Sequence, residues 1–455
     1  MDEIDHLLTK SQKVLNKKYI HFDTNPSREM AAKFISSTVL HPNAVAAYRF
    51  FPLIVYSQKR KRYHRTKGHL RANYSIKKRP ISLVAHHDAL VYVKYAEELN
   101  RNYEQYLAAN DIFKVPTAYR KALHQSNINA AKDVFDFIAK SEDCWIIKGD
   151  FKGFFDNMRH RILQKNLVQV LAVDKLSADW RAVLKSVTRF RSVDSRDLMR
   201  AIHTLGWVRG KESPYVRSRE RLGELITKGG LSIKKPNQIG IPQGTPISAV
   251  LANVYMISFD VELNRIVSAL SGLYRRYSDD FVIVIPEVEL PEKNLEEFIT
   301  RVITTSKQST SLEIETHKTK IFKFNARMDE KITQRNLNGN FESNKVWFDY
   351  LGFIFNGDVV RLREKGIYKF HYKSKKAINL FLRIENDREQ IKNNNVPKPS
   401  QKGRVVWTSK KQVMDRLSQV PKQQKFEERI KFTQDNISYN CQGQFKNVGF
   451  RQKEM

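Results

Sequence analysis

The residues with the clearest chemical potential are two adjacent carboxylates in the segment Tyr277–Asp280, which reads Tyr-Ser-Asp-Asp. β-branched and aromatic residues flank this segment between Gly272 and Pro286, so the pattern predicts two short strands of a hairpin with the carboxylates at its tip. Adjacent carboxylates repel each other unless a cation lies between them, and Mg²⁺ prefers carboxylate oxygens together with phosphate oxygens and water. The segment predicts a divalent-metal site or, as the simpler alternative, an exposed acidic turn.

A third carboxylate, Asp150, ends a different apolar segment, after which we expect a helix with Asp156 or Asn157 as its N-cap. If that strand lies beside the hairpin, Asp150, Asp279 and Asp280 converge on one point, where three carboxylates hold two Mg²⁺ ions. Such two-metal sites support phosphoryl transfer, because the ions activate the attacking hydroxyl and neutralise the leaving group.

The segment Gly240–Ser248 combines glycines with a helix start. Glycines let the backbone approach a ligand closely, and Thr245 and Pro246 suit the N-cap and first turn of a helix expected over about 247–266. Gln243 lies at the entrance of this helix, within reach of a sugar, a base or a nucleic-acid strand. A plain loop entering a core helix fits the same pattern.

The composition indicates a folded protein with a polyanionic partner. The 455 residues include 80 Lys and Arg against 48 Asp and Glu, a formal charge of +32, with 41% hydrophobic residues. Nucleic acid fits best, because basic side chains that neutralise phosphates release counterions. The most basic window, residues 59–79, has ten Lys and Arg and no acid, and its Tyr63 and Tyr74 suit base stacking; a solvated loop is the alternative.

The sequence has few signals that would indicate a membrane span, secretion or a role for its cysteines. No run approaches 18 apolar residues, and the first residues are acidic where a secretory signal is basic and then apolar. The only cysteines, Cys144 and Cys441, have no metal-ligand spacing, so we expect neither a disulfide framework nor a zinc site. A reducing, cytoplasmic location is the expectation.

In this order, the motifs resemble those of the reverse transcriptases over about residues 57–356. The matching blocks are Asp150 with Phe154–Asp156, Gly240–Ser248, Tyr277–Asp280, Leu312–Ile321 and Tyr350–Phe353. Five blocks in family order are much harder to obtain by chance than any one alone. The resemblance implies an α+β right-hand polymerase fold with fingers, a palm made of an antiparallel sheet backed by helices, and a helical thumb.

The same resemblance implies roles for individual residues near the carboxylates. Asp150, Asp279 and Asp280 become the metal ligands, with the main-chain carbonyl of Phe151 as an extra ligand, and Mg²⁺ is the expected metal, with Mn²⁺ as a substitute. Phe155 lies where viral-type RNA polymerases carry an aspartate. Its ring is expected to collide with a ribose 2′-hydroxyl, so deoxynucleotides should be preferred.

Further residues are expected to contact the nucleotide and the primer. Arg79 resembles the fingers arginine that grips the triphosphate, with Lys77 or Lys78 assisting, and Lys318 matches a lysine near the nucleotide phosphates that can protonate pyrophosphate. Gln243 is grouped with these substrate-binding residues. The turn at Tyr350, Leu351 and Gly352 resembles the one that positions the primer end.

We expect a helical extension at 1–56, fingers at 57–142, a palm at 143–356 with a helical insert at about 172–236, and a thumb with a basic helical extension at 357–455. The predicted activity is RNA-directed DNA synthesis. The chain is similar to bacterial defence-associated and abortive-infection reverse transcriptases, which implies a companion noncoding RNA as template and antiphage defence. The sequence does not determine the oligomeric state, and a homo-oligomer is one option. Retron or group II intron-type enzymes, an untemplated or protein-primed DNA polymerase and a catalytically silent RNA-binding scaffold are the alternatives.

Overall fold

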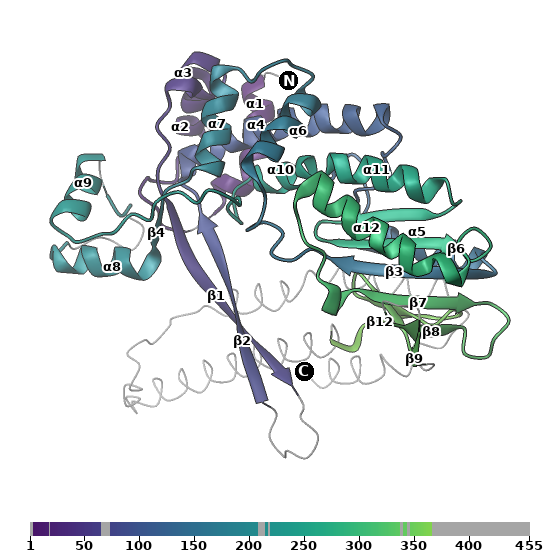
Figure 1. Ribbon diagram of the computed structural model, residues 1–455. Coiled ribbons are helices and arrows are strands. Elements are labelled where there is room, and N and C mark those ends of the chain that lie inside the picture. Colours follow the sequence, from purple (N-terminus) through teal and green to yellow (C-terminus); the bar gives the residue numbers. More distant parts are fainter. Residues whose placement is uncertain are drawn as a thin grey trace, which may run out of the picture.

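The computed structural model describes residues 3–17, 19–64, 73–207, 214–216, 219–336, 340–343 and 346–365. In Figure 1 a long β-hairpin extends away from a group of helices, and a sheet with its own covering helices lies beside it. The predicted thumb and basic extension lie outside the described residues from position 366 onward. Among the helices that are described, none is both long and apolar enough to cross a membrane.

The central sheet has six antiparallel strands in the order β5-β6-β3-β7-β8-β9. The strands are β3 (Asp143–Asp150), β5 (Leu273–Tyr277), β6 (Asp280–Pro286), β7 (Lys320–Asn325), β8 (Ile332–Arg335) and β9 (Phe341–Ser343). A second, three-stranded sheet contains β10 (Phe348–Tyr350), β11 (Phe353–Phe355) and β12 (Val360–Leu362).

Both faces of the six-stranded sheet are buried at β3. Trp145 and Ile147 of β3 belong to the largest apolar cluster, with residues of α11 (Ile257–Ser268) and α12 (Leu295–Thr310). Cys144 and Ile146 point to the opposite face, where α5 (Asn127–Lys140) and the three-stranded sheet form a second cluster. The alternation along β3 explains its continuous apolar run, because a strand covered on both faces needs apolar residues at every position.

A long hairpin, expected to belong to the fingers, joins β1 (Leu53–His64) to β2 (Asn73–Leu83), and β4 (Ser192–Asp194) adds in parallel to the root of β1. β4 belongs to the segment expected as a helical insert at about 172–236. The helices of this segment are α7 (Ala178–Thr188), α8 (Ser195–Thr204) and α9 (Arg219–Thr227). The N-terminal region contains α1 (Glu3–Leu15), α2 (Arg28–Phe34), a π-helix at Ile35–Val39 and α3 (Pro42–Ala47), and packs against α4 (His86–Ala109). The remaining helices are α6 (His160–Leu171), α10 (Ser248–Tyr255), and the short 3₁₀ turns η2 (Glu292–Asn294) and η3 (Thr316–Lys318).

Three expected helix boundaries were wrong. The N-terminal helices end at Ala47 instead of near residue 56, because β1 already begins at Leu53. α6 begins at His160 with Arg159 as its N-cap, since residues 152–157 form a series of turns after β3 instead of a helix. The helix expected over 247–266 begins at Ser248 and is divided at Met256 into α10 and α11.

The loop before α10 connects the β1–β2 hairpin to the segment after β3 through backbone hydrogen bonds. The Gln243 carbonyl accepts from the N–H of Ser82 on β2 (2.8 Å), while the Ile241 N–H donates to Phe155 on the palm side (2.9 Å). Gly244 has φ +126, and a Cβ there would lie 2.4 Å from the Ser82 carbonyl oxygen. Only glycine allows this close approach, so the loop fixes the root of β2 against the palm.

Candidate active site

The strand β3 lies beside the β5–β6 hairpin, which is the condition under which the three carboxylates are expected to converge. In the antiparallel register, Asp150 at the end of β3 is the partner of Asp280 at the start of β6. The N–H of Phe151 donates to the carbonyl of Asp279 in the hairpin turn (3.3 Å). The backbones of the three acidic residues therefore meet at one end of the sheet, since paired residues on neighbouring strands lie about 5 Å apart.

The turn that carries Asp279 is short. Tyr277 and Asp280 are the last paired residues, so only Ser278 and Asp279 connect the two strands. Ser278 has φ +62, a conformation that non-glycine residues rarely adopt and that costs about 1–3 kcal/mol unless its surroundings hold it. Nη1 of Arg276 donates to the Ser278 carbonyl (3.0 Å), which holds the turn from inside the protein.

Arg276 forms a fully buried ion pair with Asp260 of α11. Both side chains have 0% exposure, and Nε and Nη2 of Arg276 donate to the two carboxylate oxygens of Asp260 at 2.8 and 2.7 Å. The Tyr274 hydroxyl donates to the same carboxylate (2.8 Å), and Nη1 of Arg276 also donates to Oδ1 of Asn253 on α10 (3.3 Å). This network links the strained turn at Ser278 to both helices that follow the Gly240–Ser248 segment.

The carboxylates at the hairpin tip influence each other's protonation. Burial is the main cause that raises the pKa of Asp280 to about 6, against the opposing charge of Lys148. The nearby Asp279 and Asp150 carboxylates raise this pKa further. Burial also raises the pKa of Asp279, and the charge of Asp150 acts in the same direction. The three groups therefore concentrate negative charge where a cation is needed to balance it.

A lysine provides one positive charge at this site. Lys318 of η3 donates from Nζ to Oδ2 of Asp150 (2.9 Å), a hydrogen bond that raises the pKa of Lys318. Among the described residues, no three His, Cys, Asp or Glu side chains gather closely enough to form a ready metal site. The set of three carboxylates, two of them with pKa values raised by burial, nevertheless has the oxygen donors that Mg²⁺ prefers. The metal-ligand role of Asp150, Asp279 and Asp280 stays a prediction.

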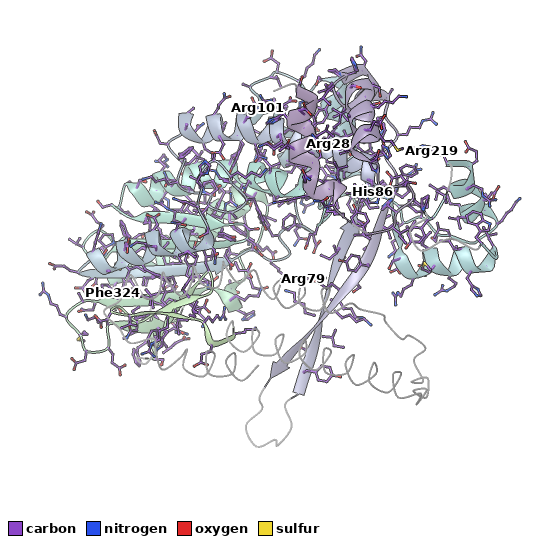
Figure 2. All side chains as sticks on the ribbon, turned by 180° about the vertical axis from the view of Figure 1, so that it is seen from behind. Arg28, Arg79, His86, Arg101, Arg219 and Phe324 are labelled. Atoms are coloured by element: carbon purple, nitrogen blue, oxygen red, sulfur yellow. The ribbon has the colours of Figure 1, made fainter. Side chains whose placement is uncertain are left out.

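The predicted fingers cations lie on β2. Arg79 is the partner of Gln58 on β1, and its positive charge opposes the burial that raises the pKa of Asp279. Figure 2 shows Arg79 on the part of the hairpin that is turned toward the palm. Side chains alternate along a strand, so Lys77 shares the face of Arg79 while Lys78 lies on the other face. Of the two lysines, Lys77 is therefore better placed to assist Arg79.

Phe155 and Gln243 lie in two segments that a backbone hydrogen bond joins. Phe155 is half-buried, with its ring 5.4 Å from the ring of Phe154 in an edge-to-face contact, and Phe154 is buried in the core. The Phe155 carbonyl accepts from Ile241, two residues before Gln243. The loop thus fixes Phe155 near the end of β3.

The predicted primer-positioning turn lies between β10 and β11. Leu351 and Gly352 both have positive φ, and the Leu351 carbonyl accepts from Asn127 of α5 (2.9 Å). The side chain of Tyr350 is fully buried, so a primer contact from this motif must come from Leu351 and Gly352. The neighbouring Asp349 accepts hydrogen bonds from Nζ of Lys148 through its carbonyl (2.7 Å) and its carboxylate (3.2 Å).

Sequence reasoning missed Lys148, Arg276 and Asp260. Lys148 precedes Asp150 by two residues, and alternation alone could have placed it on the same face as that carboxylate. The pairing of Arg276 with Asp260 has no local signal, because the two residues lie on a strand and a helix that meet only in the folded protein.

We expect Asp260→Ala to lower the free energy of unfolding by about 3–5 kcal/mol, because Arg276 is left as an uncompensated buried charge. Chemical denaturation would measure this change. Glu262→Ala is a matched control on the same helix, since Glu262 pairs with Arg265 at the surface and its removal should change stability little. Equal effects of the two substitutions would contradict the role of the buried pair.

Comparisons with known proteins identify the family. The reverse transcriptase (RNA-dependent DNA polymerase) family matches residues 75–355. No curated protein matches the chain. Similar solved structures include apo telomerase from Candida tropicalis truncated from its C-terminal domain, with 10% identity, a TM-score of 0.41 and coverage of 73% of this chain and 59% of that one. Telomerase from Candida albicans in complex with a TWJ fragment of telomeric RNA has 12% identity, a TM-score of 0.35 and coverage of 88% and 60%.

The chain spans about 59% and 60% of the length of these two telomerase chains. The family match contains β3, the Gly240–Ser248 segment and the β5–β6 hairpin, and it confirms the predicted α+β right-hand polymerase fold. Members of this family generally use divalent metal ions, typically Mg²⁺. Since the match extends over more than half of the sequence, the chain belongs to the reverse transcriptase family, whose members are RNA-directed DNA polymerases and hence nucleotidyltransferases.

Proposed function

We propose that this protein is an RNA-directed DNA polymerase that adds deoxynucleotides to the 3′-hydroxyl of a primer. The observation that carries the proposal is the register that places Asp150 opposite Asp280, with Asp279 in the adjoining turn. The positive charges of Lys318 and Arg79 act on this same group of carboxylates. Phosphoryl transfer requires carboxylates that can hold metal ions and positively charged groups that can bind phosphate, close to one another.

Each of these residues has a defined task in the proposed reaction. Asp150, Asp279, Asp280 and the main-chain carbonyl of Phe151 would hold two Mg²⁺ ions, or Mn²⁺ as a substitute. Bound there, such ions activate the primer hydroxyl and neutralise the leaving pyrophosphate. Lys318, whose Nζ donates to Oδ2 of Asp150, would donate its proton to the departing group in this proposal.

The fingers and the neighbouring loop orient the substrates in this proposal. Arg79 and Lys77, on one face of β2, grip the triphosphate, because guanidinium and ammonium groups bind phosphate oxygens strongly. Gln243 contacts the sugar, base or template from the loop. Leu351 and Gly352 position the primer end at the second sheet.

We expect Asp279→Asn/Asp280→Asn to reduce Mg²⁺-dependent incorporation of dNTPs on an RNA template with a DNA primer by a factor of at least about 10³, because electrostatic stabilisation is the main catalytic effect. A primer-extension assay measures the rate. Asp136→Asn, which removes an exposed carboxylate from α5, is the control and should leave the rate unchanged. A wild-type protein without metal-dependent synthesis would point to a silent scaffold, and synthesis without a template would point to untemplated polymerisation.

Phe155→Ala should relax sugar selection, since the half-buried ring of Phe155 is the group proposed to exclude a 2′-hydroxyl. We expect the ratio of ribonucleotide to deoxynucleotide incorporation, measured as kcat/KM, to rise about 10-fold or more. Phe154→Leu is the comparison variant, because Phe154 is a core residue and its substitution should affect stability before selectivity. An unchanged ratio in Phe155→Ala would contradict the steric gate.

We further propose that the template is a companion noncoding RNA and that the enzyme acts in the cytoplasm in antiphage defence. The net charge of +32 supports an RNA partner, and Ser278, where group II intron enzymes usually carry alanine, argues against that alternative. Sequencing the nucleic acid that copurifies from the native host at low salt should return one discrete RNA and its complementary DNA. A random sample of cellular transcripts would refute the companion-RNA assignment.

A further inference from the structure

A basic groove lies between α6 and α7, outside the group of three carboxylates. Two adjoining hollows of about 630 and 880 Å³ share His160, Arg161 and Gln238 in their linings. We call them together the α6–α7 groove. Its described lining contains no Asp or Glu, and its Lys and Arg residues are Arg159, Arg161, Lys165, Arg181, Lys185 and Arg189.

The cations form a row on each wall of the groove. Arg161 and Lys165 are four residues apart on α6. Arg181 and Lys185 have the same spacing on α7, and Arg189, four residues further on, is the C-cap of that helix. Residues four apart lie on the same helix face, about 6 Å from each other along the axis, so the row along α7 extends about 12 Å. Two facing rows of this length match an extended anion better than a single phosphate group.

These cations lack the acidic partners that neutralise other basic residues. In the described part of the chain, none of the six forms an ion pair, and all six are exposed. Arg181 donates one N–H to the Leu176 carbonyl (2.8 Å) and keeps its other donors. In the hollow beside Tyr277, by contrast, Lys10 and Lys121 both pair with Glu97, at 3.1 and 3.2 Å. The groove therefore has a concentrated positive charge that no acidic side chain of the described residues balances, and an external anion would balance it.

We propose that the α6–α7 groove binds the phosphate backbone of an RNA strand outside the primer–template channel. The inference rests on the proposed function, because it assigns the groove to the RNA partner of a polymerase. The groove adjoins the Gly240–Ser248 loop: Arg159 and Ile239 form a β-bridge, and His160 hydrogen-bonds the Gly240 carbonyl through Nε2 (2.8 Å). RNA held here stays attached while its template segment passes the carboxylates.

The test compares the full-length protein with the variant Arg181→Gln/Lys185→Gln/Arg189→Gln. The probe is a labelled hairpin RNA, added after the primer–template channel has been saturated with a short unlabelled RNA·DNA duplex. We expect Kd for the hairpin to rise about 10-fold or more at ~0.15 M salt, and the slope of log Kd against log salt to fall by about 2, because three phosphate contacts are lost. Arg161→Gln/Lys165→Gln on the opposite wall should weaken binding in the same direction.

The control Arg101→Gln/Arg301→Gln/Lys307→Gln also removes three positive charges, but from exposed positions of α4 and α12. It should leave Kd unchanged. Equal loss of affinity in control and groove variant would overturn the proposal. A raised KM for dNTPs with unchanged RNA binding would overturn it in favour of nucleotide steering, and preferential competition by duplex DNA would assign the groove to product instead. Primer extension on the short duplex tests the proposed function separately, since the groove variant should retain it.

Discussion

The buried ion pair between Arg276 and Asp260 is the constraint on which the geometry of the carboxylate site depends. Two opposite charges without contact to water must be satisfied by each other and by neighbouring polar groups, and one of those groups is the carbonyl of Ser278. Arg276 also exchanges backbone hydrogen bonds with Val115 and Thr117. A single residue thus fixes the strand, the turn and an adjacent segment, so Asp279 is presented beside Asp150 before any ligand binds.

Sequence patterns predicted the local parts of this site and missed their long-range supports. The hairpin could be recognised because its short strands are rich in β-branched and aromatic residues and lie between Gly272 and Pro286. The strand ending at Asp150 could be recognised by its apolar run, which burial on both faces requires. The start of α6 was misplaced because Asp156 and Asn157 have capping side chains but lie in the turns that shape the region around Phe155. The break at Met256 has no glycine or proline to announce it.

The loop from Gly240 to Ser248 forms hydrogen bonds with segments that are far apart in the sequence. It bonds to Ser82 in the fingers and to Phe155 and Met158 in the palm, and the residues just before it line the α6–α7 groove. A high net charge alone would not distinguish these regions. The difference lies in local pairing: cations near the carboxylates act on acidic groups of the chain itself, whereas those of the groove have none in the described structure.

The pairing of β1 with β4 supports the root of the β1–β2 hairpin but not its outer part. β4 pairs with β1 only at Leu53–Val55, and the bond from Ser82 to Gln243 secures the same level of β2. Arg79, paired with Gln58, lies three residues beyond this anchor, on a ribbon of two strands, which has little stiffness of its own. We therefore expect the outer ribbon to bend at its root. A substitution in β4 would therefore loosen the root of the hairpin and change the freedom of movement of Arg79, the residue proposed to bind the triphosphate.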